Sequence, residues 1–423
     1  MVCRIRNRLC HSPSSYHNGE LNMELMLGRD IATQKNVYLD AAGSRAVLIC
    51  GKRGSGKSYT LGVLIEELVA VGGANVIPII IDPMGIYHTM VMRNDKQSDE
   101  LYQWGLPVQA FAVRLLIPGI PDELYDSDVL RELTRRGVEV SPLRLNASDL
   151  NPDGWCDLFG ASINDPMGIV LFRAVQTLGE SHRAFGVADL ARAVQSDKRA
   201  KDTSKEALLN RLEAAQNWHL FNEDGYQPMD NIFTPGVVNI VDVSRLDSGA
   251  YGRRNLIVSV IARNLFRARS DARLREEFGL AGKLPRVWMA MDEAHQFIPD
   301  GSGSLAKPQL IRWAKEGRQP GLSLVVATQQ PSAIDAEVLS QCDIILSHKL
   351  TSRDDVMALN KLSQDYMGGE LRAIIADLKR TGQAVLVDDE RESVTMMQIR
   401  PRQSQHGGGT TASIKVDDYD LWS

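Results

Sequence analysis

The sequence predicts an α/β protein whose core is a mostly parallel sheet with helices on both faces. Short, continuously apolar segments, typical of strands buried on both faces, alternate with segments of helical periodicity along most of the 423 residues. A glycine-rich turn at Gly51–Ser58 joins one of these strands directly to a helix. Several of the strands end in acidic or polar residues, which indicates a site at the carboxyl edge of the sheet.

The first part of the core contains three predicted strands. Arg45–Cys50 is apolar and leads into the glycine-rich turn, and residues 57–71 follow with apolar side chains at helical spacing. A second strand is expected at Asn75–Asp82, where Pro78 favours an edge position or a short bulge. The third is expected at Ala110–Ile117.

Residues 121–235 interrupt this alternation, because helical periodicity dominates there, and we interpret them as a mostly helical insertion. The insertion divides the core into residues 23–120 and 236–400. Residues 1–22 are interpreted as a disordered or weakly ordered arm, and residues 401–423 as an extended C-terminal tail. Strands are expected again in the second part of the core at Gly236–Val243, Arg286–Asp292, Leu322–Thr328, Cys342–Lys349 and Gln383–Asp388.

The composition excludes several classes of protein. The net charge of −5 excludes a globally basic nucleic-acid coat, so nucleic acid would have to contact a local basic surface, such as a pore formed by several subunits. The five cysteines are scattered without CxxC spacing, which favours a reducing cytoplasm over a disulfide framework or zinc site. No apolar run reaches the roughly 18 residues that span a bilayer, so we expect no membrane association.

The glycine-rich turn matches the P-loop pattern G-x-x-x-x-G-K-[ST] between a strand and a helix. Its backbone N–H groups can surround the phosphates of ATP, Lys57 supplies a positive charge, and the Ser58 hydroxyl can hold Mg²⁺. The sequence therefore predicts ATP and Mg²⁺ as cofactors. The residues expected at the nucleotide are Gly51, Arg53, Gly54, Ser55, Gly56, Lys57, Ser58 and Tyr59.

The strand expected at Arg286–Asp292 ends in Asp292, and a second acid, Glu293, follows it directly. Asp292 can complete the Mg²⁺ shell, and Glu293 can act as the general base toward water. An acidic pair at this place can also cap a helix. His295, two residues later, is interpreted as a packing or positioning residue and not as a metal ligand.

Further polar residues lie where they could assist hydrolysis. Gln329 directly follows Thr328 at the end of the strand Leu322–Thr328. Its amide can contact the γ-phosphate or the attacking water, or Gln329 can be a simple turn residue. Arg312, Lys315 and Arg318 form either a solvated basic helix end or, in a ring, a source of an arginine finger for the neighbouring subunit.

Two positions outside these motifs are open to more than one interpretation. Asp82 ends its strand and can contact the nucleotide or Mg²⁺-bound water, or cap the turn that follows. The loop Pro299–Pro308 is rich in glycine and carries Lys307, which could contact a DNA phosphate if the loop lined a pore. An ordinary exposed loop is the alternative.

Together these segments resemble the HerA-type ATPases of the HerA/FtsK group. The resemblance implies a RecA-like P-loop core that assembles as a hexameric ring. It implies nucleotide binding by the P-loop, Mg²⁺ and water activation by Asp292 and Glu293, and γ-phosphate sensing by Gln329. It also implies that Arg318, and Arg45 as a second arginine, act on the adjacent subunit. The matching segments are GSRAVLICGKRGSGKS, IIIDPMGIY, VNIVDVSRLD, MAMDEAHQF, KEGRQPGLSLVVATQQPSAIDAEVLSQCDIIL and IRPRQSQHGG.

The sequence departs from this family in two ways. Ile86 replaces the glutamate of the D-x-x-G-E element, so an acidic role at that position is not expected. The N-terminal β-barrel that docks a nuclease in full-length relatives is expected to be absent or reduced.

The resulting hypothesis is a homohexameric, ATP-hydrolysing translocase on double-stranded DNA that works with a nuclease or other effector in DNA processing or anti-phage defence. The alternative is an ATPase ring that holds and gates a toxic effector, a nuclease or an NAD-consuming enzyme, without translocation. A conjugative coupling ATPase is less consistent with the sequence, because such proteins need membrane segments.

Overall fold

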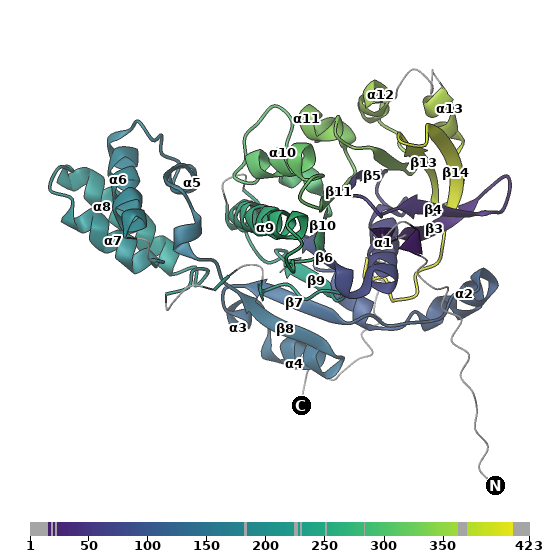
Figure 1. The fold of residues 1–423 in the computed structure, drawn as a ribbon, viewed down its shortest axis with the longest axis horizontal. Coiled ribbons are helices and arrows are strands. Elements are labelled where there is room, and N and C mark those ends of the chain that lie inside the picture. Colours follow the sequence, from purple (N-terminus) through teal and green to yellow (C-terminus); the bar gives the residue numbers. More distant parts are fainter. Residues whose placement is uncertain are drawn as a thin grey trace, which may run out of the picture.

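A sheet of twelve strands organises this computed structural model, in the order β4-β3-β14-β13-β12-β5-β11-β10-β6-β9-β7-β8 (Figure 1). The strands from β12 to β8 in this order are parallel. Those from β4 to β13 pair antiparallel, and β13 pairs antiparallel with β12. The predicted mostly parallel sheet is confirmed. The structure describes residues 16–17, 20–21, 23–181, 184–223, 227–228, 231–249, 252–282, 284–362 and 370–408.

Each strand of the parallel part places alternate side chains on opposite faces of the sheet. In β5, Leu48 and Cys50 pack into one core, whereas Val47 and Ile49 pack into a second core on the other face. The strands are β3 (Glu24–Asp30), β4 (Asn36–Asp40), β5 (Ala46–Cys50), β6 (Val76–Asp82), β7 (Val113–Pro118), β8 (Val138–Leu143), β9 (Val238–Asp242), β10 (Arg286–Met291), β11 (Leu322–Thr328), β12 (Ile344–Ser347), β13 (Gln383–Asp388) and β14 (Ser393–Ile399), and a separate pair is formed by β1 (Tyr16–His17) and β2 (Glu20–Leu21).

Helices cover both faces. α1 packs in the second core, against β3, β5, β6 and β11, while α9 and α10 pack in the first. Among the described residues, no helix combines the length and apolar composition needed to cross a bilayer. The helices are α1 (Lys57–Gly72), α2 (Ser98–Trp104), α3 (Pro121–Leu124), α4 (Ser127–Arg135), α5 (Pro152–Leu158), α6 (Pro166–Glu180), α7 (Val187–Ser196), α8 (Asp202–Gln216), α9 (Arg253–Glu277), α10 (Lys307–Glu316), α11 (Ala336–Leu339), α12 (Arg353–Leu362) and α13 (Glu370–Asp377).

The segment expected to be a helical insertion contains α3 to α8, but also β8, which pairs with β7 at the edge of the sheet. Helices α5 to α8 pack on one another and form a lobe to one side of the sheet (Figure 1). Trp155 anchors this lobe, with its ring stacked on Phe221 at 5.4 Å and tilted against Phe159 at 5.5 Å.

The expectation that Pro78 marks an edge strand is wrong. β6 lies between β10 and β9 in the middle of the sheet. The proline is tolerated because pairing with β9 begins only at Ile79, beyond the position that lacks an N–H. The side-chain amide of Asn239 also donates to Pro78 O at 3.1 Å, which pairs that carbonyl.

The arrangement of strands positions the site. β5, β11, β10 and β6 are adjacent and parallel, so their carboxyl ends lie on the same edge of the sheet. The turn after β5 is the P-loop, and the segments after β10 and β11 carry the two acids and Gln329. The amino ends of the same strands lie on the opposite edge.

Candidate nucleotide-binding and hydrolysis site

The P-loop forms a tight turn between β5 and α1. Gly54 and Gly56 have φ angles of 76° and 112°, in the left-handed region that glycine adopts without strain. Gly56 is the N-cap of α1, so the first N–H groups of that helix point toward the loop. Ser55 Oγ is buried and has no hydrogen-bond partner among the described residues, as expected of a group that fits a phosphate oxygen. Arg53 is exposed on the loop.

Lys57 lies against both acids. Its Nζ is 2.5 Å from Asp292 Oδ1 and 3.0 Å from Glu293 Oε1. Burial disfavours the charge on Lys57, but the two carboxylates outweigh it and raise the pKa of this lysine. Burial is likewise outweighed at Asp292, whose pKa is lowered by Lys57 and by hydrogen bonds. Lysine and carboxylate are therefore ionised together in a buried site.

The oxygen atoms suited to Mg²⁺ lie next to each other. Ser58 Oγ donates to Asp292 Oδ2 at 2.6 Å, so a hydroxyl and a carboxylate oxygen converge at the start of α1. Hard oxygen ligands of this kind, few in number and beside a phosphate-binding turn, fit the preference of Mg²⁺ for a partial protein shell completed by phosphate and water. Ser58 and Asp292 would hold the ion, whose charge would neutralise the phosphate oxygens.

Glu293 has an unusual backbone and a fixed side chain. Its φ angle of 48° lies in the left-handed region, which costs a non-glycine residue on the order of 1 kcal/mol. The carboxylate accepts a hydrogen bond from Gln329 Nε2 at 2.6 Å in addition to the contact with Lys57. His295 Nδ1 lies 3.6 Å from the other carboxylate oxygen and 3.2 Å from Thr328 Oγ1. The structure thus brings Glu293 and Gln329 into direct contact.

Sequence reasoning missed Tyr87 as a site residue. Its hydroxyl donates to Asp292 Oδ2 at 2.9 Å from the segment after β6, and the residue is fully buried. The segment IIIDPMGIY ends on this tyrosine, but its contact with Asp292 joins positions 205 residues apart and cannot be deduced from the segment alone.

Asp82 makes the contacts of a turn cap. Its carboxylate accepts hydrogen bonds from the backbone N–H groups of the four residues from Met84 to Tyr87, at 2.8 to 3.0 Å. Burial, together with Asp242 on the neighbouring strand, raises the pKa of Asp82 to about 7. These contacts are those of the turn-capping alternative, and they hold Tyr87 beside Asp292.

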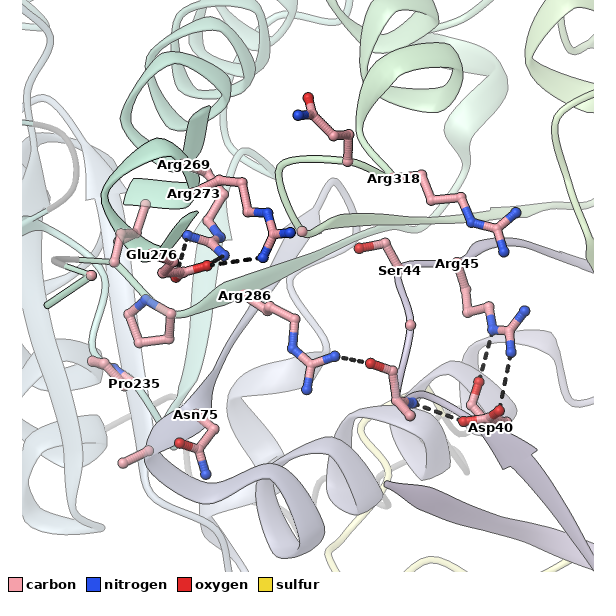
Figure 2. Close-up of a pocket in the computed structure, with 18 of the residues that line it drawn as sticks. Asp40, Ser44, Arg45, Asn75, Pro235, Arg269, Arg273, Glu276, Arg286 and Arg318 are labelled. Atoms are coloured by element: carbon pink, nitrogen blue, oxygen red, sulfur yellow. Dashed lines mark hydrogen bonds and ion pairs between the residues drawn. The ribbon is translucent and has the colours of Figure 1, made fainter. Parts of the chain in front are cut away.

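The two arginines expected to act in trans lie at the opposite edge of the sheet, beside a depression of about 1040 Å³ (Figure 2). Arg45 immediately precedes β5, and Arg318 lies in the turn before β11. Both are therefore at amino ends of strands, far along the sheet from the P-loop. Sequence reasoning missed the other arginines that line this depression, which are Arg269, Arg273 and Arg286.

Arg45 and Arg318 differ in exposure. The side chain of Arg45 is 6% exposed and is held by Asp40, Asp343 and Glu390. The side chain of Arg318 is 76% exposed, and its nearest ion-pair partner is Glu390 at 4.0 Å. Arg318 can therefore extend to a second molecule without losing buried contacts, whereas Arg45 would first have to exchange three carboxylates.

Lys307 was expected on a glycine-rich loop where it could contact a DNA phosphate, but in the structure it lies at the start of a helix. It is the first residue of α10, and its ammonium donates to Pro299 O and Ser302 O, both at 2.9 Å. A salt bridge of 2.6 Å to Asp335 completes its surroundings. Because all three donors of the ammonium are used to close the loop, this arrangement speaks against a role in binding DNA phosphates.

Comparison with known proteins agrees with this site. Residues 25–265 match the family of the helicase HerA central domain. The DNA double-strand break repair helicase HerA of Sulfurisphaera tokodaii is 25% identical over 379 residues, covering 88% of this chain and 67% of the relative. The corresponding helicase of Sulfolobus acidocaldarius is 25% identical over 361 residues, covering 84% and 65%. This chain thus spans about two thirds of the length of these curated relatives.

Among solved structures, VirB4 of Thermoanaerobacter pseudethanolicus has the same fold, with a TM-score of 0.58 at 15% identity over 89% of this chain and 96% of that one. At this identity the likeness concerns the fold alone. The family match covers more than half of the chain and includes the P-loop. The chain therefore belongs to the HerA central-domain family, and its site is that of an ATP-hydrolysing P-loop enzyme.

Proposed function

We propose that this protein is the ATP-driven motor of a ring that moves along double-stranded DNA. The observation that carries the proposal is the division of the site between two edges of one sheet. Lys57, Asp292 and Glu293 converge at the carboxyl edge, while the exposed Arg318 lies at the amino edge. Within one chain the arginine cannot reach its own P-loop, but in a ring it can reach that of a neighbour.

The residues of the carboxyl edge have separate roles in this proposal. The P-loop and Lys57 bind the phosphates, and Ser58 and Asp292 hold Mg²⁺. Glu293 takes a proton from the attacking water. Gln329 orients the Glu293 carboxylate, because its side-chain amide donates to Glu293 Oε1 at 2.6 Å. When hydrolysis removes the γ-phosphate, Gln329 loses one of its partners and can pass that change to β11 and the segments after it.

An exposed apolar patch beside the arginine depression supports a contact between copies of this chain. Leu274, Phe278 and Leu280, at the end of α9 and just after it, are 54%, 75% and 52% exposed. Arg273 and Glu276 of the same helix line the depression. Large apolar side chains rimmed by charged groups are typical of interfaces. We propose that this patch packs on the neighbouring subunit and brings Arg318 to its nucleotide, in a homohexamer.

The proposed DNA substrate rests on the relatives, which are described as DNA double-strand break repair helicases. We propose that the chain acts on duplex DNA and, from its resemblance to the HerA/FtsK group, that it works in the cytoplasm with a separate effector enzyme. This effector would be a nuclease or an NAD-consuming enzyme in DNA processing or anti-phage defence. The lobe of α5 to α8 projects from the sheet and offers a surface for such an effector (Figure 1).

The test is the ATPase rate of the purified protein with and without duplex DNA, together with the mass of the particle in solution. We expect DNA to raise the rate in a salt-sensitive way and Phe278→Asp to convert the ring to monomers that lack this stimulation. A ring whose rate ignores DNA would favour the scaffold that holds an effector. A fully active monomer would refute both proposals, because Arg318 would have no site to complete.

A further inference from the structure

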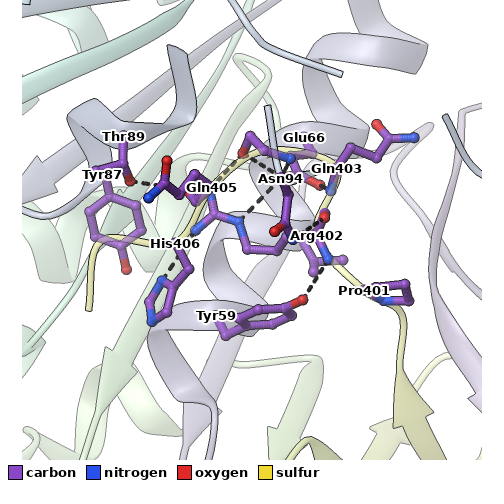
Figure 3. Close-up of polar contacts among 12 residues, drawn as sticks. Tyr59, Glu66, Tyr87, Thr89, Asn94, Pro401, Arg402, Gln403, Gln405 and His406 are labelled. Atoms are coloured by element: carbon purple, nitrogen blue, oxygen red, sulfur yellow. Dashed lines mark hydrogen bonds and ion pairs between the residues drawn. The ribbon is translucent and has the colours of Figure 1, made fainter. Parts of the chain in front are cut away.

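A segment near the C-terminus, Pro401–Gly408, crosses α1 and contacts Tyr59 in the first turn of that helix. Glu66 of α1 organises the crossing (Figure 3). Its carboxylate accepts hydrogen bonds from the guanidinium groups of Arg400 and Arg402, from the backbone of Gln403, and from both the backbone and the hydroxyl of Ser404. These bonds are between 2.6 and 3.2 Å long.

This cluster is fully inside the protein. The side chains of Glu66, Arg400 and Arg402 are all 0% exposed. Burial opposes the charge on Glu66, but the two arginines outweigh it and lower its pKa, so the carboxylate stays ionised. Buried ions are tolerated only where each is well paired, and such pairs fix one arrangement of the chain. The segment is therefore held firmly at its crossing of α1.

The far side of the segment is tied to the residues that follow β6. Asn94 donates to Arg402 O at 2.8 Å, and Thr89 Oγ1 donates to Gln405 O at 2.9 Å. Further along, Gly407 lies so close to Ile86 that a Cβ on it would be 2.5 Å from Ile86 O. The C-terminal segment thus bridges α1 and the turn that carries Tyr87.

Because it is held on both sides, the segment places His406 next to Tyr59. The two ring centroids are 5.5 Å apart with the planes at 74°. Arg402 N donates to Tyr59 OH at 2.6 Å, which fixes the tyrosine as well. Figure 3 also draws Tyr87, whose hydroxyl contacts Asp292. The side chains of Tyr59 and His406 are both partly exposed.

The direction of the bound nucleotide follows from the P-loop. With its γ-phosphate end at Lys57 and the acids, a bound nucleotide would place its α-phosphate and nucleoside on one flank of the first turn of α1, and Tyr59 lies on one of these flanks. On the other flank of the loop, His348 is 0% exposed and both its ring nitrogens are engaged, by Thr60 Oγ1 and by Gln383 O, each at 2.8 Å. That ring cannot receive a base.

We propose that His406 and Tyr59 form the wall that receives the base and ribose of ATP, so that the C-terminal segment completes the nucleotide site of its own subunit. The inference rests on the proposed ATPase. Nδ1 of His406 lies 3.3 Å from Nη1 of Arg402, an N–H donor, so the ring accepts there and carries its proton on Nε2, which can donate to the nucleoside. Burial and the charge of Arg402 lower the pKa of His406 to about 4, which keeps the ring neutral.

The test compares binding of ATP with binding of inorganic tripolyphosphate, which has the phosphates but no nucleoside. In the full chain with Mg²⁺, His406→Ala is expected to raise the Kd of ATP about tenfold or more, because one stacked aromatic is lost, and to leave tripolyphosphate unchanged. His406→Phe keeps a ring and is expected to retain most of the ATP affinity. Tyr102→Ala, an aromatic that is 86% exposed on α2, is the matched control.

Two results would overturn this inference and leave the ATPase standing. One is ATP affinity in His406→Ala within twofold of wild type. The other is an equal loss of ATP and tripolyphosphate, which would mean that the segment only supports the P-loop. Failure of the wild-type protein to bind either compound would instead refute the ATPase proposal, together with the inference built on it.

Discussion

Gln329 donates its side-chain amide to Oε1 of Glu293 over 2.6 Å and so joins the ends of β11 and β10. The same oxygen lies 3.0 Å from Lys57 Nζ. A carboxylate with two donors on one oxygen has little freedom to turn, and the other oxygen faces His295 at 3.6 Å. The orientation of the proposed base therefore depends on a neighbour in the sheet, and the two residues can be tested separately.

Glu293→Gln is expected to keep ATP binding and to reduce ATP turnover at least a hundredfold. The amide keeps the shape of the side chain but cannot take a proton from water. Filter binding of ATP and steady-state phosphate release measure the two effects. Turnover near the wild-type rate would refute the assignment of Glu293 as the base.

Gln329→Ala is expected to reduce the turnover rate about tenfold to a hundredfold, because Glu293 loses its orienting donor and water loses a polar contact. The Kd for ATP should change little. Gln330→Ala is the matched control, since this adjacent glutamine is exposed. An effect on the Kd alone, or an equal effect of both variants, would exclude the proposed role.

Sequence reasoning identified the P-loop, the two acids and Gln329, because each depends on a residue type at the end of a buried strand. It could not identify Tyr87 or His406 as neighbours of the site, because their positions depend on contacts across the fold. Tyr87 is held by the turn that Asp82 caps. The segment that carries His406 is held by ion pairs such as that of Arg400 with Glu66, residues more than 300 positions apart in the sequence. The central place of Pro78 was missed for the same reason, since pairing of β9 is a long-range property.

Arg318→Ala is expected to lower turnover about a thousandfold if the arginine acts across an interface. Mixing it with Glu293→Gln should restore activity, because about one interface in four then joins an intact acid pair to an intact arginine in a head-to-tail ring. Phosphate release before and after mixing measures the recovery. Arg312→Ala, at an exposed position of α10, is the control and should need no rescue. Absence of recovery in stable mixed rings would contradict action in trans.

Tyr87→Phe removes the hydroxyl that donates to Asp292, a hydrogen bond to a charged group worth about 1.5–3 kcal/mol. We expect a higher Mg²⁺ concentration at half-maximal ATPase, by about threefold to tenfold, because Asp292 is no longer oriented. Tyr125→Phe is the control: that hydroxyl donates to Asp242, outside the site. Equal Mg²⁺ dependence of the two variants and wild type would show that Tyr87 only packs.

His348 predicts a dependence of stability on pH. Burial, partly opposed by the hydrogen bond to Gln383 O, lowers the pKa of His348 to about 4. In the unfolded chain the pKa is about 6.5, so the unfolded state takes up the proton first as the pH falls. The contribution of His348 to stability is therefore complete above about pH 6.5 and is lost toward pH 4, by roughly 2 kcal/mol at pH 5.

Urea unfolding at pH 7 and pH 5 should show this loss of stability in the wild type and in His219→Gln, the control at an exposed histidine. The loss should be smaller in His348→Gln. Equal losses in all three proteins would mean that His348 is protonated in the folded state with an ordinary pKa.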